Sequence, residues 1–409
     1  MGKVILLSMS VELVAKALLF VFGMVVSNLY GLESFGEWVL VQAYLVYVFM
    51  VIDFSVFQVG VSELIKHGSN KSIGSVLPEL LLYRFLAYIL SVLALVVLNV
   101  SDLLNSDVCI ALALTATAYF FNIEFLMRAN NKTLIAASQT LCVVLVSYCS
   151  LFFALILGRE ILEYFTYRFM FVGLIYAGFV WVYRKEFGQL GSVFKLRRVG
   201  GADLLKRSFI VLLGGVFARL YFNSDLLLID VEFGQSEVGI YSALTVLYIG
   251  VVTLKGVFLN VLFPRLCVDY RRGVYRKVVV RATTLLAVAL TPVFTAMYFF
   301  GERFIGFAYG DGVWGDAYAS VFFSSIILAI FIAITSMIPV TLHVVGRSGL
   351  FLKATVAASV ANITGNLLFL PIYGLEVAVW TTLLAEVIVV AVSLPTFVLA
   401  YKGRGIEVL

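Results

Sequence analysis

The sequence is poor in the residues on which soluble enzymes and disulfide-bonded proteins depend. Its 409 residues include four cysteines and two histidines, and only 13% are charged. A Walker loop, an HExxH or GxSxG motif and an aspartate-rich pair are all absent, so ATP-driven pumping and metal-dependent chemistry have no support. The cysteines lack metal-ligand or disulfide spacing, and we interpret them as small packing residues. They are Cys109, Cys142, Cys149 and Cys267.

Apolar residues, by contrast, make up 62% of the chain, whereas soluble domains are roughly half apolar. The first apolar run, residues 4–27, has no small-residue cleavage site, and similar runs recur to the C-terminus. We therefore do not expect a removable signal peptide. The chain is predicted to stay in a membrane.

The apolar runs predict the number of membrane spans. About 20 apolar residues cross a hydrocarbon core of roughly 30 Å, and runs of this length lie almost end to end here. They predict an all-α integral membrane protein with about twelve transmembrane helices. The expected spans are 4–27, 37–60, 78–99, 106–125, 134–157, 163–183, 207–229, 238–262, 277–300, 317–341, 350–371 and 376–400.

The distribution of basic residues predicts the orientation of these spans. With the N-terminus inside, the inside loops hold most of the 29 lysines and arginines, Arg128 among them, whereas the outside loops hold only Arg159 and Arg303. Positive residues mark the cytoplasmic side, so both termini are predicted to be cytoplasmic. This topology accounts for the net charge of +5 without a nucleic-acid partner. The short outside segments leave no room for a soluble catalytic domain.

One turn motif occurs twice in the sequence. It reads YGLESFGEW at 30–38 and FGQSEVGIY at 233–241. Gly31, Gly36 and Trp38 recur 203 residues later as Gly234, Gly239 and Tyr241. Each turn joins the first two helices of a six-helix half on the outside, which predicts a duplicated, parallel repeat. A weaker relative is PIYGLEVAVW at 371–380.

The repeat predicts two pseudo-symmetric six-helix bundles around a central cavity. Their expected bounds are 1–183 and 207–409. The intervening residues 184–206 are predicted to be a solvated cytoplasmic linker, although their mixture of basic and apolar residues would also suit the surface of the inner leaflet.

Two cations lie deep in predicted spans at repeat-related positions. Lys16 is about 18 Å into the first helix, and Arg219 follows it by the same 203 residues. A lysine or arginine at mid-bilayer costs about 2.5 to 3.5 kcal/mol on insertion scales. We interpret the pair as cavity residues that bind an anionic substrate.

Further polar residues accompany these two cations on the first two helices of each half: Glu12, Asp53, Asn223, Asp225 and Lys255. They are candidate cavity residues, and none suggests a metal site or a catalytic residue. The alternative is that buried ion pairs, such as Glu12 with Lys16 or Asp53 with Lys16, fix helix contacts.

Other polar residues in the spans are better explained by structure. Arg84 and Arg168 lie near span ends, where long side chains reach the interface. Ser359, Asn362 and Asn366 share one helix face, and they and Glu386 suit hydrogen bonding between helices.

Several segments together resemble the polysaccharide exporters of the multidrug/oligosaccharidyl-lipid/polysaccharide (MOP) superfamily, specifically Wzx-type O-antigen flippases. The resemblance covers nearly the whole chain. It is carried by the order and spacing of GLESFGEWVLVQAYLVYVFMVIDFSVFQVGVSELI, DLLLIDVEFGQSEVGIYSALTVLYIG, VLFPRL, YGDGVWGDA and PIYGLEVAVW.

The resemblance implies a transporter rather than an enzyme. It implies a V-shaped cavity that opens alternately to either side of the bacterial inner membrane, in which cations engage an undecaprenyl-diphosphate-linked oligosaccharide. By position, Lys16 and Arg219 would be such cations. No cofactor is expected, and an H⁺ or Na⁺ gradient is a candidate energy source. Membrane lipid is an expected partner, and the resemblance leaves room for contacts with other polysaccharide assembly proteins.

Three other functions are considered. A multidrug efflux antiporter of the same superfamily would favour acidic cavity residues, whereas the deepest paired charges here are basic. A membrane polysaccharide polymerase or glycosyltransferase would carry a large outside loop. A purely accessory membrane protein would not need cations inside its spans.

Overall fold

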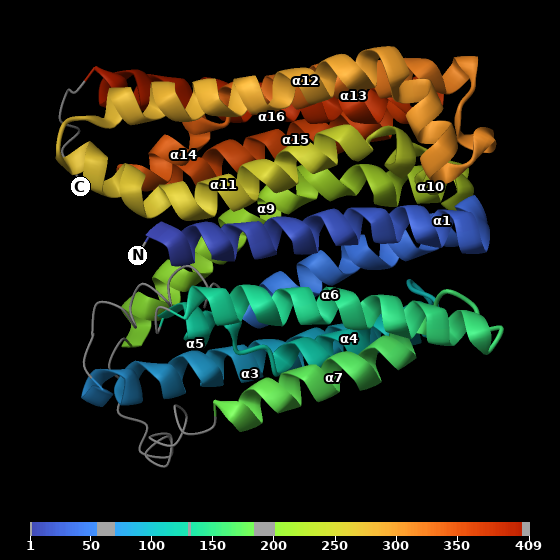
Figure 1. The fold of residues 1–409 in the computed structure, drawn as a ribbon, viewed down its shortest axis with the longest axis horizontal. Helices are drawn as coiled ribbons and strands as arrows, with labels where there is room; N and C mark the ends of the chain where they lie inside the picture. Colours follow the sequence, from blue (N-terminus) through green and yellow to red (C-terminus); the bar gives the residue numbers. More distant parts are fainter. Residues whose placement is uncertain (1, 55–69, 130–131, 184–200, 403–409) are drawn as a thin grey trace. The chain divides into compact units, whose positions relative to one another are not determined.

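The computed structural model describes residues 2–54, 70–129, 132–183 and 201–402 (Figure 1), and within them every regular element is a helix. This confirms the all-α fold. The predicted linker 184–206 falls mostly outside the described residues. By its internal contacts the chain divides into two compact units. Unit 1 comprises Met1–Leu19 and Val41–Val216, and unit 2 comprises Phe20–Leu40 and Phe217–Leu409.

Unit 1 is built from helices that follow one another closely in the sequence. It contains both ends of α1 (Gly2–Asp53), the first part of α9 (Gly201–Phe233), and the helices between them. In Figure 1, α3, α4, α6 and α7 lie side by side, and α4 and α6 each contact α7. The described helices between α1 and α9 are α3 (Asn70–Val100), α4 (Ser106–Phe120), α5 (Glu124–Ala129), α6 (Thr133–Ile156) and α7 (Tyr164–Val182).

Unit 2 is organised around its last helix, α16 (Glu376–Tyr401), which packs against α12, α13, α14 and α15 and also contacts α9. Small residues such as Ala354, Ala358 and Ala385 are buried where α9, α15 and α16 meet, which lets these helices approach closely. Besides α16 and the second part of α9, unit 2 contains α10 (Gln235–Leu244), α11 (Val246–Arg271), α12 (Tyr275–Tyr309), the 3₁₀ turn η3 (Asp311–Val313), α13 (Asp316–Thr335), α14 (Met337–Val344) and α15 (Ser348–Tyr373).

The described helices account for the predicted membrane spans. Ten of them are long and apolar enough to cross a bilayer, or eleven when the pair Gln235–Leu244 and Val246–Gly256, bent by 62°, counts as one span. One of these candidates, Ser10–Asp53, covers most of the first two predicted spans, because α1 consists of two helices joined at Gly31. The protein is therefore a multi-pass membrane protein.

The repeated turn has the same backbone conformation in both places. Gly31 has φ 86° and ψ 173°, and Gly234 has φ 88° and ψ 176°. Positive φ strains residues that carry a side chain but not glycine. The glycine that the two sequences share is therefore the residue that ends one helix and starts the next.

The second glycine of each turn creates a contact between the two turns, inside unit 2. A Cβ atom at Gly36 would overlap the carbonyl oxygen of Gln235, and a Cβ atom at Gly239 would overlap the carbonyl oxygen of Leu32. Gln235 follows Leu32 by 203 residues, as Gly239 follows Gly36. The contact is thus reciprocal, and we call these four residues the glycine contact. Helix backbones come this close only where a side chain is missing.

Hydrogen bonds also fix the N-terminal turn within unit 2. The Asn28 side chain donates from Nδ2 to the Ala308 carbonyl oxygen at 2.7 Å, and Ser27 Oγ donates to the Tyr309 carbonyl oxygen at 3.4 Å. The Phe35 ring lies 5.4 Å from the Tyr309 ring, centroid to centroid. These contacts explain why residues 20–40 belong to unit 2, although the sequence predicts them in the N-terminal bundle.

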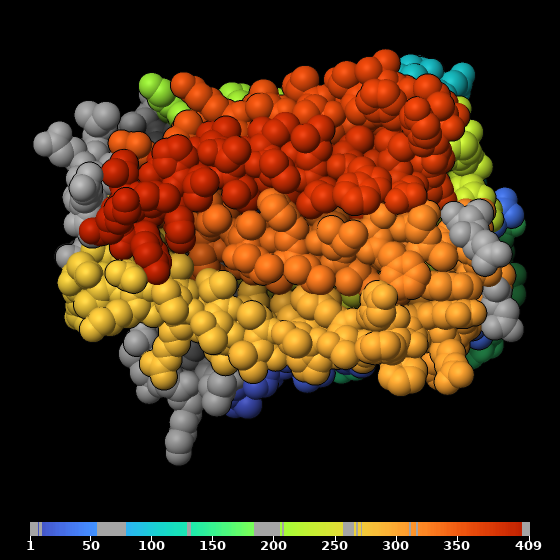
Figure 2. Space-filling model, turned by 90° about the horizontal axis from the view of Figure 1, so that it is seen from above, coloured from blue at the N-terminus to red at the C-terminus, as the bar shows by residue number. Residues whose placement is uncertain are grey.

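One face of unit 2, shown in Figure 2, is formed by α12, α13 and α16. On α12 large apolar side chains are exposed, including Val288 at 67% and Phe299 at 71%. Such exposure is costly in water and favourable in lipid. This face therefore suits contact with acyl chains.

Candidate functional site

A buried polar site surrounds the carboxyl group of Asp225, on α9. The Asp225 side chain is 1% exposed and lies eight residues from the end of α9, or about 12 Å along the helix axis. Its Oδ1 accepts hydrogen bonds from Asn362 Nδ2 at 3.2 Å and Asn366 Nδ2 at 2.9 Å. Its Oδ2 accepts from Tyr241 OH at 3.1 Å and Thr382 Oγ1 at 2.7 Å.

Four helices supply these groups. Tyr241 is on α10, Asn362 and Asn366 are one turn apart on α15, and Thr382 is on α16. Thr381, beside Thr382, donates from Oγ1 to Asn366 Oδ1 at 2.9 Å. We call these six residues the Asp225 cluster. The prediction that Asn362 and Asn366 form hydrogen bonds between helices is confirmed.

The chemistry of the Asp225 cluster is unusual for the interior of a membrane protein. All the described groups that donate to Asp225 are uncharged amides and hydroxyls. An ionised carboxylate buried in a bilayer is costly unless a positive charge compensates it. Proton uptake, or binding of a small hard cation, would supply that charge, and the oxygen atoms of Asp225, Asn362, Asn366 and Thr382 are the ligand type that such cations prefer.

A second buried carboxyl group in unit 2, that of Glu386, has a simpler set of described hydrogen bonds. Glu386 on α16 is 2% exposed, and its Oε1 accepts a hydrogen bond from Tyr221 OH at 3.2 Å. This bond confirms the predicted helix-linking role of Glu386. Among the described residues, no group of three or more His, Cys, Asp or Glu side chains is placed to hold a metal ion.

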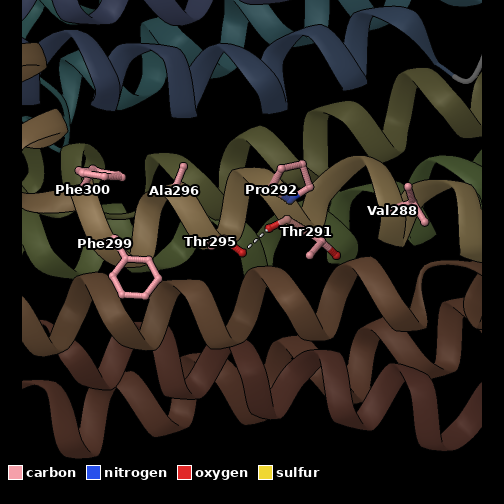
Figure 3. Close-up of a pocket in the computed structure, with 7 residues that line it drawn as sticks. All are labelled: Val288, Thr291, Pro292, Thr295, Ala296, Phe299 and Phe300. Atoms are coloured by element: carbon pink, nitrogen blue, oxygen red, sulfur yellow. Dashed lines mark hydrogen bonds between the residues drawn. The ribbon is translucent and has the colours of Figure 1, made fainter.

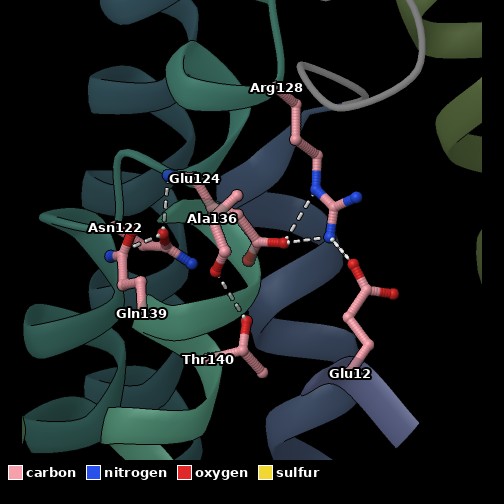
Figure 4. A network of polar contacts seen from close by, with 7 residues as sticks. All are labelled: Glu12, Asn122, Glu124, Arg128, Ala136, Gln139 and Thr140. Carbon is pink, nitrogen blue, oxygen red and sulfur yellow. Dashed lines mark hydrogen bonds and ion pairs between the residues drawn. The ribbon is translucent and has the colours of Figure 1, made fainter. Parts of the chain in front are cut away.

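In unit 1 a group of partly buried charges is arranged differently, as Figure 4 shows. Arg128 Nη2 lies 2.7 Å from Glu12 Oε1 and 2.6 Å from Glu124 Oε1. The arginine therefore compensates both carboxylates directly. The sequence placed Arg128 in a loop, and the structure places it on α5, at the end of the candidate span Ser106–Arg128. The pairing of Glu12 with Arg128 could not be predicted, because the two residues are 116 positions apart.

Arg84 has a structural role, as predicted, but it is buried within unit 1 and does not reach the interface. Its guanidinium is 1% exposed and donates to the carbonyl oxygens of Tyr119 at 2.9 Å and Asn122 at 2.6 Å. Carbonyl groups at a helix C-terminus lack helical partners and favour a nearby cation. Arg84 thus completes the end of α4. Arg168 likewise donates from Nε to Ser147 Oγ at 3.2 Å.

The other predicted site residues are distributed between the two units. Lys16 is exposed and Asp53 is partly buried in unit 1. Arg219 is exposed, and Asn223 and Lys255 are partly buried, in unit 2. Asp225 is buried among α10, α15 and α16, whereas Arg219 on the same helix is exposed. That Lys16, Arg219 and their companions line one cavity stays a prediction.

A hollow of about 560 Å³ lies on α12, along the face that carries Val288, Pro292 and Phe299 (Figure 3). The two hydroxyl groups that line it, those of Thr291 and Thr295, donate hydrogen bonds to backbone carbonyl oxygens of α12 itself. Thr291 Oγ1 donates to the Ala287 carbonyl oxygen at 2.8 Å, and Thr295 Oγ1 to the Thr291 carbonyl oxygen at 2.9 Å. The hollow therefore suits an apolar chain of the bilayer better than a charged ligand.

Solved structures share this fold over nearly the whole chain. An inward-facing multidrug resistance MATE family transporter of the MOP superfamily is 12% identical, with a TM-score of 0.69 over 98% of this chain and 99% of that one. The lipid II flippase MurJ in an inward closed conformation is 15% identical, with a TM-score of 0.70 over 97% and 90%. The bent form of the Vibrio cholerae MATE transporter VcmN is 12% identical, with a TM-score of 0.65 over 98% and 96%.

These likenesses define the class: the fold is that of the transporters of the MOP superfamily. The sequence matches no functionally curated protein. Residues 1–268 match the model of the polysaccharide biosynthesis protein family, and the chain belongs to that family. The resemblance stated from the sequence motifs is therefore confirmed.

Proposed function

We propose that this protein is a flippase that moves an undecaprenyl-diphosphate-linked oligosaccharide, such as an O-antigen repeat unit, across the bacterial inner membrane. The observation that carries the proposal is the family match over residues 1–268 in a chain with the fold of a lipid II flippase. The protein acts as a transporter and not as an enzyme, and both of its termini are cytoplasmic.

The physical task explains why such a substrate needs a protein. A diphosphate and its sugars cannot enter hydrocarbon, because charged and polar groups lose their hydration there. A wet cavity with cations lets the head group cross while the lipid tail stays in the bilayer. Lys16 and Arg219 bind the diphosphate, and rocking of the two halves opens the cavity to each side in turn.

The Asp225 cluster is the proposed coupling site. A buried carboxylate held by uncharged donors gains most from a monovalent cation, H⁺ or Na⁺, because the cation removes an uncompensated charge. Binding there changes the contacts among α9, α10, α15 and α16. A gradient of that ion would then bias the transport cycle towards export.

Deletion of the gene tests the function. The deletion strain should lose its surface polysaccharide and accumulate lipid-linked repeat units on the cytoplasmic side, and the wild-type gene should restore export. If only polymer length changed, a polymerase would be the better assignment. Proteoliposomes with either a Na⁺ or a pH gradient identify the coupling ion, because only the relevant gradient should accelerate flipping.

A multidrug efflux antiporter is the second candidate, and the similarity to a MATE family transporter supports it. It predicts that expression of this protein lowers the accumulation of cationic dyes in cells and leaves surface polysaccharide unchanged in the deletion strain. The flippase proposal predicts the reverse for both measurements.

A further inference from the structure

A second cavity, of about 330 Å³, lies at the end of unit 2 that the topology places outside. Its lining residues include no member of the Asp225 cluster and neither of the predicted cavity cations. Its walls come from three places: the α9–α10 turn, the start of α13 and the α15–α16 turn. The side chains that matter to the argument are Phe233, Glu237, Tyr318, Ser320, Tyr373 and Glu376.

Two copies of one local motif build this cavity. Gly234 and Gly374 both have positive φ, 88° and 75°, so α9 and α15 end abruptly there. An aromatic residue precedes each glycine, and a glutamate follows within three residues. Each turn therefore brings one ring and one carboxylate to the cavity wall.

Both carboxylates are oriented by uncharged donors. Glu237 Oε1 accepts from Tyr318 OH at 2.9 Å. Glu376 Oε1 accepts from Ser324 Oγ at 2.8 Å and from Trp380 Nε1 at 2.9 Å. Each glutamate also lies in the first turn of its helix, where the helix dipole favours negative charge. An ionised carboxylate accepts about four hydrogen bonds, so both groups retain capacity for donors of a ligand.

The lining selects the chemistry of that ligand. Two carboxylates repel phosphate, which excludes the diphosphate end of a lipid-linked substrate. The exposed rings of Tyr373, at 70%, and Phe233, at 39%, offer flat apolar surfaces. A sugar ring matches both features, because its neighbouring hydroxyls donate to carboxylates and its C–H face packs on an aromatic ring. A role as interfacial anchors accounts for exposed rings but not for two oriented carboxylates between them.

We propose that this cavity is a binding site for an uncharged sugar. The inference rests on the proposed function, because the sugar would belong to the oligosaccharide as it reaches the outside. The site would hold the sugar end of the substrate, while cations elsewhere hold the diphosphate. It would therefore contribute to the choice among repeat units.

Binding of free sugars tests the proposal without transport. The purified full-length protein in nanodiscs is titrated with glucose, galactose, mannose, rhamnose and N-acetylglucosamine, and binding is followed by saturation-transfer NMR. At least one sugar should bind. Glu237→Gln and Glu376→Gln should each weaken binding roughly 10-fold, because a hydrogen bond to a charged group contributes about 1.5 kcal/mol or more.

The matched control is Glu163→Gln, an exposed glutamate of unit 1 that pairs with Arg159 at 3.5 Å. It should bind sugar as the wild type does. No sugar binding by the wild type, or unchanged binding in the Glu237→Gln, Glu376→Gln double variant, would overturn the proposal. Ethanolamine binding in place of sugars would assign the cavity to a lipid amine instead.

Export measurements separate this inference from the proposed function. If the deletion strain exports normally, the flippase assignment fails, whatever the sugar titration shows. If deletion blocks export but the wild-type protein binds no sugar, only the cavity proposal fails.

Discussion

The two copies of the repeat place different chemistry at equivalent positions. In the first copy, Phe22 and Trp38 are buried together, with their ring centroids 5.5 Å apart. The residues 203 positions later are Asp225 and Tyr241, and Tyr241 OH donates to Asp225 Oδ2 at 3.1 Å. An aromatic pair in one copy thus corresponds to an acid and its hydrogen-bond donor in the other.

This difference separates what the duplication preserved from what it did not. The backbone was preserved, since Gly31 and Gly234 share one conformation and the glycine contact is reciprocal. The buried side chains diverged, because each had only to suit its own neighbours. Asp225 is tolerated where Asn362 and Thr382 donate to it, whereas Phe22 packs in an apolar site. We therefore place the proposed ion coupling at Asp225 in the second copy, since the equivalent position in the first copy is Phe22.

Removing the acid should have the largest effect. Asp225→Asn keeps the size of the side chain but removes its charge and half of its acceptor capacity. Flipping driven by an ion gradient in proteoliposomes should fall by roughly 100-fold, the upper range of coupling between two sites. The control is Glu386→Gln, whose amide oxygen still accepts from Tyr221 and which should flip normally. Ion-driven flipping at the wild-type rate by Asp225→Asn would remove the cluster from the mechanism.

The glycine contact tests how symmetric the repeat is. Gly36→Ala and Gly239→Ala should each lower stability by about 2 kcal/mol, because the added methyl group meets backbone atoms that cannot rotate away. The apparent unfolding temperature in detergent should fall by a similar amount for both. The double variant should lose less than the sum, since one separation of the turns relieves both overlaps.

Gly250→Ala is the matched control for this pair, because its Cβ would have no neighbour within 4 Å. It should unfold at the wild-type temperature or above. A large loss of stability for one of Gly36→Ala and Gly239→Ala, and none for the other, would contradict the expected symmetry. The two positions would then share their geometry but not their contribution to stability.

Neutralising either of the repeat-related cations should reduce transport by a similar amount, and by less than Asp225→Asn does. Lys16→Gln and Arg219→Gln should each reduce export roughly 10-fold, the contribution of one charge-assisted hydrogen bond, while the amount of inserted protein stays unchanged. Lys16→Arg and Arg219→Lys should retain most of the activity. If protein levels fall before export does, these residues are structural ion-pair partners. Normal export by the Lys16→Gln, Arg219→Gln double variant would exclude both from substrate binding.

The smallest expected effect comes from Tyr241→Phe, which can be compared with a variant at the equivalent position of the first copy, Trp38. Tyr241→Phe removes one of the four hydrogen bonds to Asp225 and should cost about 1 kcal/mol of stability, with a modest change in the ion concentration needed for half-maximal flipping. Trp38→Phe, at the equivalent position, should leave that concentration unchanged. A shift for both variants would contradict the assignment of coupling to one half.

Local features of the sequence predicted much of the fold. Apolar run lengths located the spans, because a bilayer imposes one length on every helix. The turns at Gly31 and Gly234 were predictable because positive φ selects glycine and the spacing repeats. The sequence did not reveal that residues 20–40 pack in unit 2, since this depends on contacts with Ala308, Tyr309 and Gln235, far away in the chain.

The candidate site was only partly predictable, for a similar reason. Asp225 stood out as an acid in a membrane span, but its burial depends on Asn362 and Thr382, more than 130 positions away. Arg128 was assigned to a loop because the surrounding residues are polar. Its role becomes visible only once folding brings Glu12 to it.

The glycine contact has the form of the interface in a two-fold symmetric dimer. In such a dimer residue i of one subunit meets residue j of the other, and j meets i. Here Gly36 meets Gln235, which is the repeat counterpart of Leu32, and Leu32 meets Gly239, which is the repeat counterpart of Gly36. One polypeptide thus contains the interface that two copies of a half-length ancestor would form. Such an ancestor would have needed only one small residue to create both halves of the contact, whereas the duplicated chain must keep a glycine at each of two positions that now mutate independently.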